Sequence, residues 1–455
     1  MSTQEPSTSY RPQTGCVDLE TSIDTYCTYL SKFQFDKARD FCEEQRLTQA
    51  AHVSSKQWQC LVANLSQLAL NESHYFSLVF FSSKFSFRKD NQVREAYVNV
   101  KNELEYCYEE CDKSTETNEN NDEFKEFLRQ LICLCTIRSK LVEFYVFLVT
   151  DNWHQTIEES EKHLNMIKNS MEKVLGDDIK LPQLKSIEIE LKILTGCFKI
   201  QSDLLNINFI DSLIQLKQLA QDLNTWFSHV PFKTSTSKPN FLFFNFAKSS
   251  KNTPKLLLLH WFSKFYNTLL AKLCLYGHEL FVSHLNSNDV KSLLNAQPSF
   301  IQSIVSYSRR VNSAMICLLL DRMDNKEPFY GFGYQNALTK YGKDNIGPLT
   351  GRHGMYPALC RFPNDQKLFD TLHPSIISLI QDTAENSDER IRFYYDLRAN
   401  TTYFTVLVEK NVHLSVVLNR KVSEKDQTIQ LMFTDLLHGL RLISLIHDLR
   451  QSHKN

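Results

Sequence analysis

Residues 122–150 read DEFKEFLRQLICLCTIRSKLVEFYVFLVT, and their apolar side chains recur at steps of three and four residues or multiples of these steps. Such spacing places side chains on one face of an α-helix. The charged residues Arg129, Lys140 and Glu143 lie off this face. The apolar face consists of Phe124, Phe127, Leu131, Leu134, Leu141, Tyr145 and Leu148. The stretch therefore predicts a long helix with one buried side.

This helix lies in a run of 160 residues, Cys16–Leu175, that contains neither glycine nor proline. At average usage about 19 of these two residues would occur there. Turns made by polar residues alone suit a stack of long helices. Further apolar stripes predict helices over 19–33, 55–83, 88–112, 152–174, 184–206, 209–228, 254–285 and 299–310. Long helices with short connections favour an antiparallel bundle, with a solenoid as the alternative.

The pattern changes in the last third of the chain, where six of the 11 glycines fall within 331–354. Alternating or strand-length apolar segments predict β-strands over 315–320, 356–362, 390–397, 402–409 and 412–419. Pro357 favours an edge position for the second of them. Helices are expected over 373–382 and from Ile429 to Ile443. We therefore expect an α+β protein whose small C-terminal antiparallel sheet carries helices on one side.

The expected domain organisation follows from these two patterns. A disordered tail covers 1–17, a helical bundle domain covers 18–296 with a long loop over 229–255, and a mixed α/β docking module covers 297–455. The loop contains an unusually apolar centre, with Phe243 and Phe244 in the run FLFFNF. This centre either folds back onto the bundle or serves as a docking peptide. The module has the element order of longin-, roadblock- and profilin-like modules, which pair with copies of themselves or dock proteins; this is an analogy of fold only.

Composition excludes several classes of protein. Lys+Arg 51 against Asp+Glu 52 leaves a net charge of −1, which gives no general attraction to nucleic acid or to anionic lipid. No apolar run approaches the ~20 residues of a membrane helix, so no direct membrane insertion is expected. The polar N-terminus lacks the features of a signal peptide, and the 12 cysteines are scattered. We expect a cytoplasmic protein with reduced thiols.

Local signatures of catalysis or cofactor binding fail. The pair Gly331 and Gly333 is followed by Asn336 where a dinucleotide fingerprint needs glycine, and Gly342-Lys343 is followed by Asp344 rather than Ser or Thr. Cys133 and Cys135 point to different faces of a helix, whereas Cys107 and Cys111 could share one face but have no nearby histidine. We expect no catalytic residue, no cofactor and no metal site.

The aromatic cluster Phe329, Tyr330, Phe332 and Tyr334 stands at the start of the glycine-rich loop. Aromatic side chains on a loop are good anchors for protein interfaces. They either pack the loop onto its own sheet or bind a partner. Together with Phe243 and Phe244 they are the candidate partner-binding residues.

Several stretches, taken together and in order, resemble the KICSTOR subunit 2 family. They are Tyr29–Arg46, Phe85–Glu103, Leu256–Leu280, Val311–Tyr334 with LLLDR and GFGY, Tyr356–Pro363 (YPALCRFP) and Arg392–Val417. The tail, the polar run 112–122 and the content of 232–255 depart from the family pattern.

This resemblance implies a non-enzymatic scaffold subunit whose partners are other KICSTOR-like subunits and the GATOR complex. That complex stimulates GTP hydrolysis on Rag GTPases, so the implied role is inhibition of mTOR complex 1 on amino-acid or glucose deprivation. Recruitment to the lysosomal surface would occur through partners, and the C-terminal module could self-associate.

Two other functions stay open. Longin-like modules also bind SNAREs and coat proteins, which suggests a vesicle-trafficking adaptor. An enzyme of unrecognised type would close the 331–354 loop over a pocket with titratable groups such as Asp321, His353 and His373.

Overall fold

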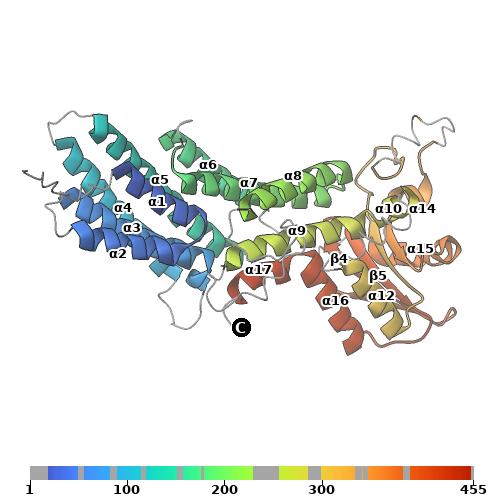
Figure 1. Cartoon of the computed structure of the whole chain (residues 1–455). Coiled ribbons are helices and arrows are strands. Elements are labelled where there is room, and N and C mark those ends of the chain that lie inside the picture. The colour runs from blue at the N-terminus through green and yellow to red at the C-terminus, as the bar shows by residue number, and fades with distance from the viewer. Residues whose placement is uncertain are drawn as a thin grey trace, which may run out of the picture.

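The computed structural model describes residues 19–49, 56–81, 90–113, 119–150, 157–175, 179–228, 256–284, 299–333, 341, 347–382 and 390–451. The chain is elongated, with helices at one end and a β-sheet at the other (Figure 1). The α+β fold class is thereby confirmed. The predicted tail over 1–17, the loop over 229–255 and the centre of the 112–122 run lie outside the described residues.

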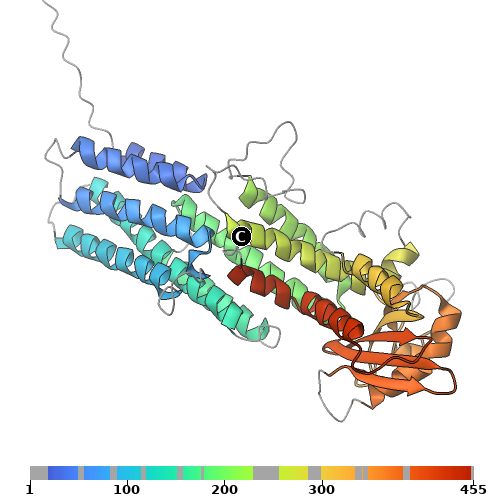
Figure 2. The ribbon, with the colours of Figure 1, turned by 90° about the horizontal axis from the view of Figure 1, so that it is seen from below.

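Consecutive helices of the N-terminal part pack against one another and run along the long direction of the molecule (Figure 2). A 3₁₀ turn, η1 (Val79–Phe81), follows the third helix. The helices are α1 (Leu19–Ser31), α2 (Phe35–Gln49), α3 (Lys56–Phe76), α4 (Asp90–Lys113), α5 (Glu119–Thr150), α6 (Ile157–Leu175), α7 (Pro182–Leu205), α8 (Phe209–Phe227), α9 (Leu257–Tyr276) and α10 (His278–His284).

Three helix predictions need correction. Helix α2 is absent from the predicted elements, because its buried stripe includes the weakly apolar residues Ala38 and Cys42 and its mean hydropathy is low. The helix expected over 55–83 ends at Phe76, and Leu78 takes a left-handed backbone with φ 54°. The helix expected over 254–285 is interrupted at Gly277, where an added Cβ would lie 2.7 Å from the Phe281 ring.

The C-terminal part contains one five-stranded antiparallel sheet with the strand order β2-β1-β5-β4-β3. All five predicted strands are confirmed, as is the edge position of the strand next to Pro357. The two-residue turn between β4 and β5 places Asn411 at φ 65°, a conformation that asparagine tolerates better than most residues. The strands are β1 (Met315–Leu320), β2 (Ala358–Phe362), β3 (Arg392–Asp396), β4 (Thr401–Glu409) and β5 (Val412–Leu418).

Helices cover both faces of this sheet, so the expectation of helices on one side is wrong. Met315, Cys317 and Leu319 of β1 pack with α15 (Gln366–Gln381) in a small separate core. The intervening residues of β1 belong to the main core together with α9, α12 (Phe300–Val311) and α16 (Gln427–Leu440), on the other side of the sheet (Figure 1). Every residue of β1 is buried, which explains its continuous apolar sequence.

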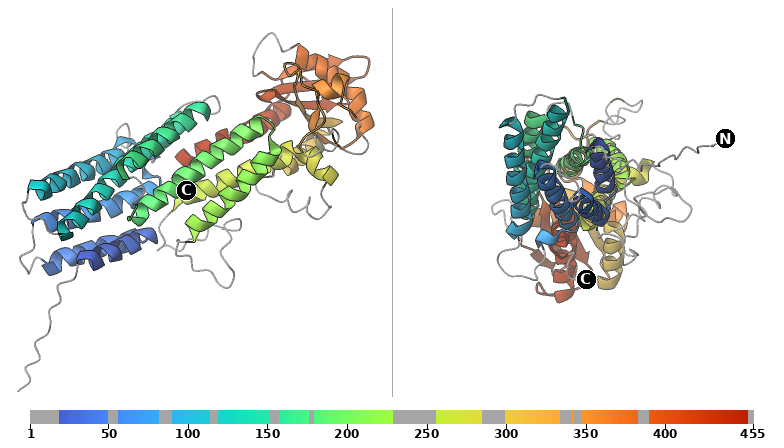
Figure 3. Two further views of the ribbon diagram at one scale, coloured as in Figure 1. Left: turned by 90° about the horizontal axis from the view of Figure 1, so that it is seen from above. Right: turned by 60° about the vertical axis from the view of Figure 1, so that its left-hand side comes forward.

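The predicted closing helix is two helices, because the chain turns at Leu442, where φ is 59°. The second, α17 (Ile443–Gln451), leaves the sheet and contacts α5, α9 and η1. The left-hand view of Figure 3 shows that the C-terminal segment runs back along the helical part. Among the described residues no single helix has the length and apolar character to cross a membrane; α16 and α17 meet these requirements only as a pair bent by 75°.

A short helix, α14 (Gly351–Met355), precedes β2 and was not predicted. Gly351 at its start has a φ of 62°, and an added Cβ at Gly354 would lie 2.2 Å from the Leu349 carbonyl oxygen. The glycines of this segment therefore allow a tight approach of backbone to backbone.

Two buried histidines, one on α15 and one on β5, should make the stability of the C-terminal part sensitive to acid. Burial lowers the pKa of His373 and of His413 to about 4, against an ordinary value of 6.5. As the pH falls, the unfolded chain therefore takes up these protons first, so stability present above pH 6.5 is lost progressively down to about pH 4. At pH 5 the loss should be about 2 kcal/mol for each histidine.

Urea unfolding at pH 7.5 and pH 5 measures this loss. The variant His373→Gln/His413→Leu should lose much less stability between the two pH values than the wild type does. The exposed His438→Gln variant is the matched control and should behave as the wild type. Equal acid sensitivity in the double variant and the wild type would contradict the assignment.

Candidate functional site

Two of the predicted partner-binding residues are largely buried inside the chain. Phe329 and Phe332 are 9% and 7% exposed, and their ring centroids lie 4.9 Å apart. Phe332 also packs on Phe209 of α8 at 5.9 Å, and the Arg322 guanidinium lies 4.5 Å from the Phe329 ring centroid. These contacts hold the loop onto α8. Most of the apolar surface of these two phenylalanines is therefore buried inside the protein.

Tyr330 of the same cluster is partly exposed. Tyr334, Phe243 and Phe244 lie outside the described residues. A role of this set in partner binding stays a prediction.

The titratable groups suggested for an enzyme are only partly brought together. The rings of His353 and His373 lie 5.2 Å apart, and His373 Nε2 is 3.0 Å from the carbonyl oxygen of Tyr356. The Asp321 carboxylate instead accepts a hydrogen bond from the backbone N–H of Met323, and burial raises its pKa. Among the described residues Asp321 makes no hydrogen bond with either histidine, so these three side chains form no connected proton-transfer chain.

The described cysteines lie mostly in the core. Within the described ranges no three His, Cys, Asp or Glu side chains are arranged to hold a metal ion. Cys133 and Cys135 are buried in α5, and burial raises the pKa of both thiols. Cys107 Sγ lies 2.8 Å from Cys60 Sγ of α3, and burial is the largest cause that raises the pKa of Cys107 to about 12.

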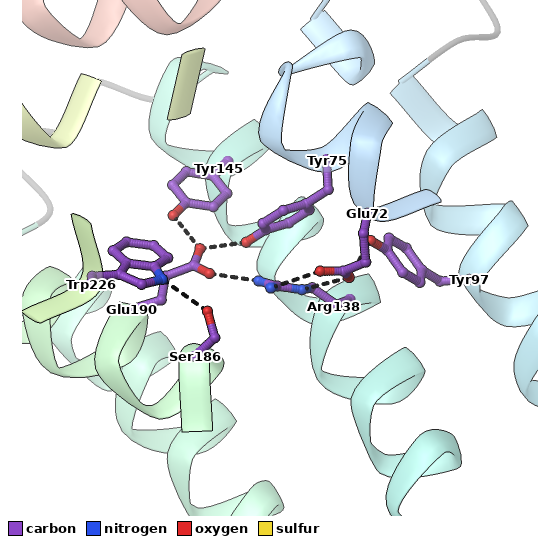
Figure 4. Close-up of polar contacts among 8 residues, drawn as sticks. All are labelled: Glu72, Tyr75, Tyr97, Arg138, Tyr145, Ser186, Glu190 and Trp226. Carbon is purple, nitrogen blue, oxygen red and sulfur yellow. Dashed lines mark hydrogen bonds and ion pairs between the residues drawn. The ribbon is translucent and has the colours of Figure 1, made fainter. Parts of the chain in front are cut away.

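Among the described residues, a buried ionic cluster joins several helices of the helical part (Figure 4). Arg138 of α5 donates to both carboxylate oxygens of Glu72 of α3, with N–O distances of 2.9 and 3.1 Å. On its other side it donates to Glu190 of α7 at 2.5 Å. All three side chains are at most 3% exposed. The guanidinium thus lies between two carboxylates contributed by different helices.

Three tyrosine hydroxyls complete the hydrogen bonding of these carboxylates. Tyr97 of α4 donates to Glu72 at 2.8 Å, while Tyr75 of α3 and Tyr145 of α5 donate to Glu190 at 2.5 and 2.7 Å. Burial, followed by the neighbouring carboxylate charge, raises the pKa of all three hydroxyls well above its usual value. The tyrosines therefore stay protonated and act as donors.

This cluster ties α3, α4, α5 and α7 together in one arrangement. Arg138 also stacks over the Tyr75 ring, 4.2 Å from its centroid, so its guanidinium face is covered too. No face of the guanidinium is left open to a substrate. We interpret the cluster as a structural tie.

The sequence contains a signal for this cluster that belongs to no catalytic or binding motif. Arg138 stands four residues after Leu134 and three before Leu141, on the apolar face of the 122–150 helix. A charged residue in such a position needs a buried partner. Its partners lie 66 and 52 residues away in the chain, so helical spacing alone could not identify them.

A second buried ion pair joins the helices to the sheet. Lys272 of α9 is fully buried and lies 2.5 Å from the Glu409 carboxylate at the end of β4. It also donates to Gln201 of α7 at 3.2 Å and to the Leu440 carbonyl at 3.0 Å. Tyr276 donates to the other Glu409 oxygen at 2.7 Å. Burial lowers the pKa of Lys272, whereas the Glu409 charge opposes this shift.

The fold and these two clusters define an α+β protein whose most deeply buried charged groups connect one helix or strand to another. The chain belongs to the KICSTOR family: the family model described as "KICSTOR complex C12orf66 like" matches residues 15–454. The resemblance found in the sequence is thereby confirmed.

Individual relatives cover nearly the whole chain. It is similar to a protein of Xenopus laevis named KICSTOR subunit 2, with 25% identity over an alignment of 443 residues that covers 94% of this chain and 96% of the relative. A Danio rerio protein of the same name is 24% identical over an alignment of 430 residues that covers 92% of this chain and 93% of the relative. The helical part and the sheet part both lie within the matched region.

Removal of the central arginine should destabilise the protein strongly. In Arg138→Met, Glu72 and Glu190 lose their buried counter-charge, which should cost about 3–5 kcal/mol in the free energy of unfolding. The matched control is Arg94→Met, which breaks an ion pair with Glu143 whose side chains are 43% and 52% exposed. That change should cost at most about 1 kcal/mol.

Urea unfolding gives both values, and a triple variant separates charge from packing. Glu72→Gln and Glu190→Gln added to Arg138→Met remove the uncompensated charges and should restore part of the lost stability. An Arg138→Met variant no less stable than Arg94→Met would refute the structural tie.

Proposed function

We propose that this chain is a non-enzymatic scaffold subunit of a KICSTOR-like complex. The main support for this proposal is the match of residues 15–454 to the KICSTOR family model. Two relatives, each named KICSTOR subunit 2, match over 92–94% of the chain and support it further. Because the match includes both the helices and the sheet, the proposal applies to the whole architecture rather than to one module.

The finer role follows as part of the same proposal. The complex recruits the Rag-directed GATOR complex to the lysosomal surface, and mTOR complex 1 is inhibited on amino-acid or glucose deprivation. The chain contributes contact surfaces that raise the local concentration of the GTPase activator. It reaches the lysosome through its partners. The helical region over 18–296 and the module over 297–455 supply separate surfaces, and the module can also pair with a second copy.

The interior supports a binding role more than a catalytic one. In the described part of the chain, the two deepest ionic clusters are closed by their own partners, and Asp321, His353 and His373 do not form a connected set. The exposed surface, in contrast, carries large apolar side chains on several elements, including Ile214 of α8 and Leu397 after β3, which are 63% and 80% exposed.

Affinity purification from the native cell tests the coarser proposal. A tagged full-length chain should recover the other KICSTOR-like subunits, read by mass spectrometry, both with and without amino acids. Arg138→Met serves as a negative control: because its core is destabilised, this variant should recover less of the complex than the wild type does. Recovery of SNARE or coat components in place of scaffold subunits would favour the vesicle-trafficking adaptor.

A cell lacking this chain tests the finer role. On amino-acid withdrawal, phosphorylation of mTOR complex 1 substrates should persist, and re-expression of the wild type should restore its decline. If the subunits co-purify but substrate phosphorylation responds normally without the chain, the scaffold proposal stands and the signalling role is rejected.

A further inference from the structure

A groove of about 520 Å³ lies between α1, the N-terminal half of α5 and the start of α7. Its apolar lining comes from Ile23 and Cys27 of α1, Phe124 and Phe127 of α5, and Leu181 and Pro182 at the start of α7. Ile23, Phe124 and Phe127 are only partly buried, although they pack against the main core. The groove therefore presents apolar surface that the chain itself does not fully cover.

We propose that this groove binds one amphipathic α-helix of a partner protein, with an apolar stripe and basic residues beside it. The inference deepens the proposed scaffold function, on which it rests, by naming a contact surface and the chemistry of its partner.

The walls of the groove are held in place without an occupant. Helix α1 packs on α2 and α7, whereas α5 packs mainly on α4 and α6. Gln183 of α7 donates to the Cys27 carbonyl at 3.1 Å, which fixes α1 to α7. The side-chain oxygen of Gln130 on α5 accepts the backbone N–H groups of Lys180 and Leu181 at 3.1 and 2.8 Å. Because these hydrogen bonds connect α1 and α5 to α7, the groove is preformed, and little free energy is lost in ordering it when a partner binds.

The shape suits a helix. On α1 the lining residues recur from Ile23 to Ser31, which is about 12 Å of helix or slightly more than two turns. The facing residues of α5, from Glu123 to Gln130, cover a similar length. Both walls are helices whose backbone groups are already bonded within the helix, so no open strand edge is offered to an extended peptide. A third helix packed into the groove between two others is the matching mode of recognition.

The charge on the rim selects a basic partner. Asp24 of α1 and Glu123 of α5 stand on opposite walls, and Glu126 also lines the groove; among the described residues, Lys180 is the one cationic side chain of the lining. Arg129 is paired with Glu126 at 2.7 Å, and this pairing lowers the pKa of Glu126. The balance at the rim is therefore acidic on both sides, and lysine or arginine beside the apolar stripe of the partner would complement it.

Site-specific photo-cross-linking identifies the occupant. A photoreactive residue at Thr28, an exposed position on the rim, should cross-link in native cells to a peptide of another protein. That peptide should show apolar residues at three- and four-residue steps with flanking Lys or Arg. The same probe at Thr225, which is exposed on α8, is the control. Cross-links to this chain's own segments, to a second copy, or to no protein would overturn the proposal.

Binding of the cross-linked segment, as a synthetic peptide, tests the charge. Fluorescence anisotropy with the full-length chain should show at least tenfold weaker binding to Asp24→Lys/Glu123→Lys than to the wild type. The matched control Glu188→Lys/Asp211→Lys reverses two exposed carboxylates on α7 and α8 and should bind as the wild type does. Equal affinity for all three chains would refute the acidic rim.

Co-purification with the scaffold subunits separates this inference from the proposed function. If the cross-link identifies no basic helix while the wild type still recovers the scaffold, the groove is rejected and the scaffold function stands. If the wild type recovers no scaffold subunit but the cross-link yields a basic amphipathic helix of another protein, the scaffold function is rejected and the groove stands.

Discussion

The pairing of Arg138 with Glu72 and Glu190 is the constraint on which the helical part depends. Transfer of three charged groups into a protein interior costs several kcal/mol for each ion unless geometry and hydrogen bonding compensate. Here the compensation comes from side chains on four helices, including hydroxyls of Tyr75, Tyr97 and Tyr145 that remain protonated. A shift of any of these helices would leave a buried carboxylate short of a partner. Apolar packing tolerates small shifts between helices, whereas this network permits only one arrangement.

Helix α9 connects the Arg138 cluster to the sheet. Near its start, the Trp261 ring lies 6.1 Å from that of Tyr145, a member of the cluster, and Trp261 Nε1 donates to the Leu445 carbonyl of α17. Eleven residues later, about 16 Å along the helix, Lys272 pairs with Glu409 of β4. The same helix therefore contacts both polar clusters and the C-terminal helix. The main apolar core is correspondingly continuous from Tyr26 to Leu449. The helices and the sheet are thus held in register by polar as well as apolar contacts.

Sequence periodicity predicted the helices and strands well where large apolar side chains occupy one face. The five strands and most long helices are confirmed, and the continuous apolar run of β1 is explained by burial on both faces. The pattern failed for α2, whose buried stripe includes a small residue and a thiol, Ala38 and Cys42. It also failed at Gly277 and Leu442, where a local backbone change divides a continuous apolar stripe. The partners within the polar clusters could not be predicted for another reason: Glu409 lies 137 residues from Lys272, and no local spacing links them.

The contrast between the closed interior and the open groove bears on how such a chain can act. A group already satisfied by its own protein gains nothing from a partner, so the two ionic clusters cannot provide affinity for a ligand. Partly exposed Ile23, Phe124 and Phe127 are different, because each retains apolar area that water still contacts. Burial of that area contributes about 25 cal/mol per Å², and the ties made by Gln130 and Gln183 mean that little of it is offset by ordering the walls. The buried clusters therefore fix the positions of the helices. Helices fixed in this way leave a groove of defined shape between α1, α5 and α7, at which a partner can bind.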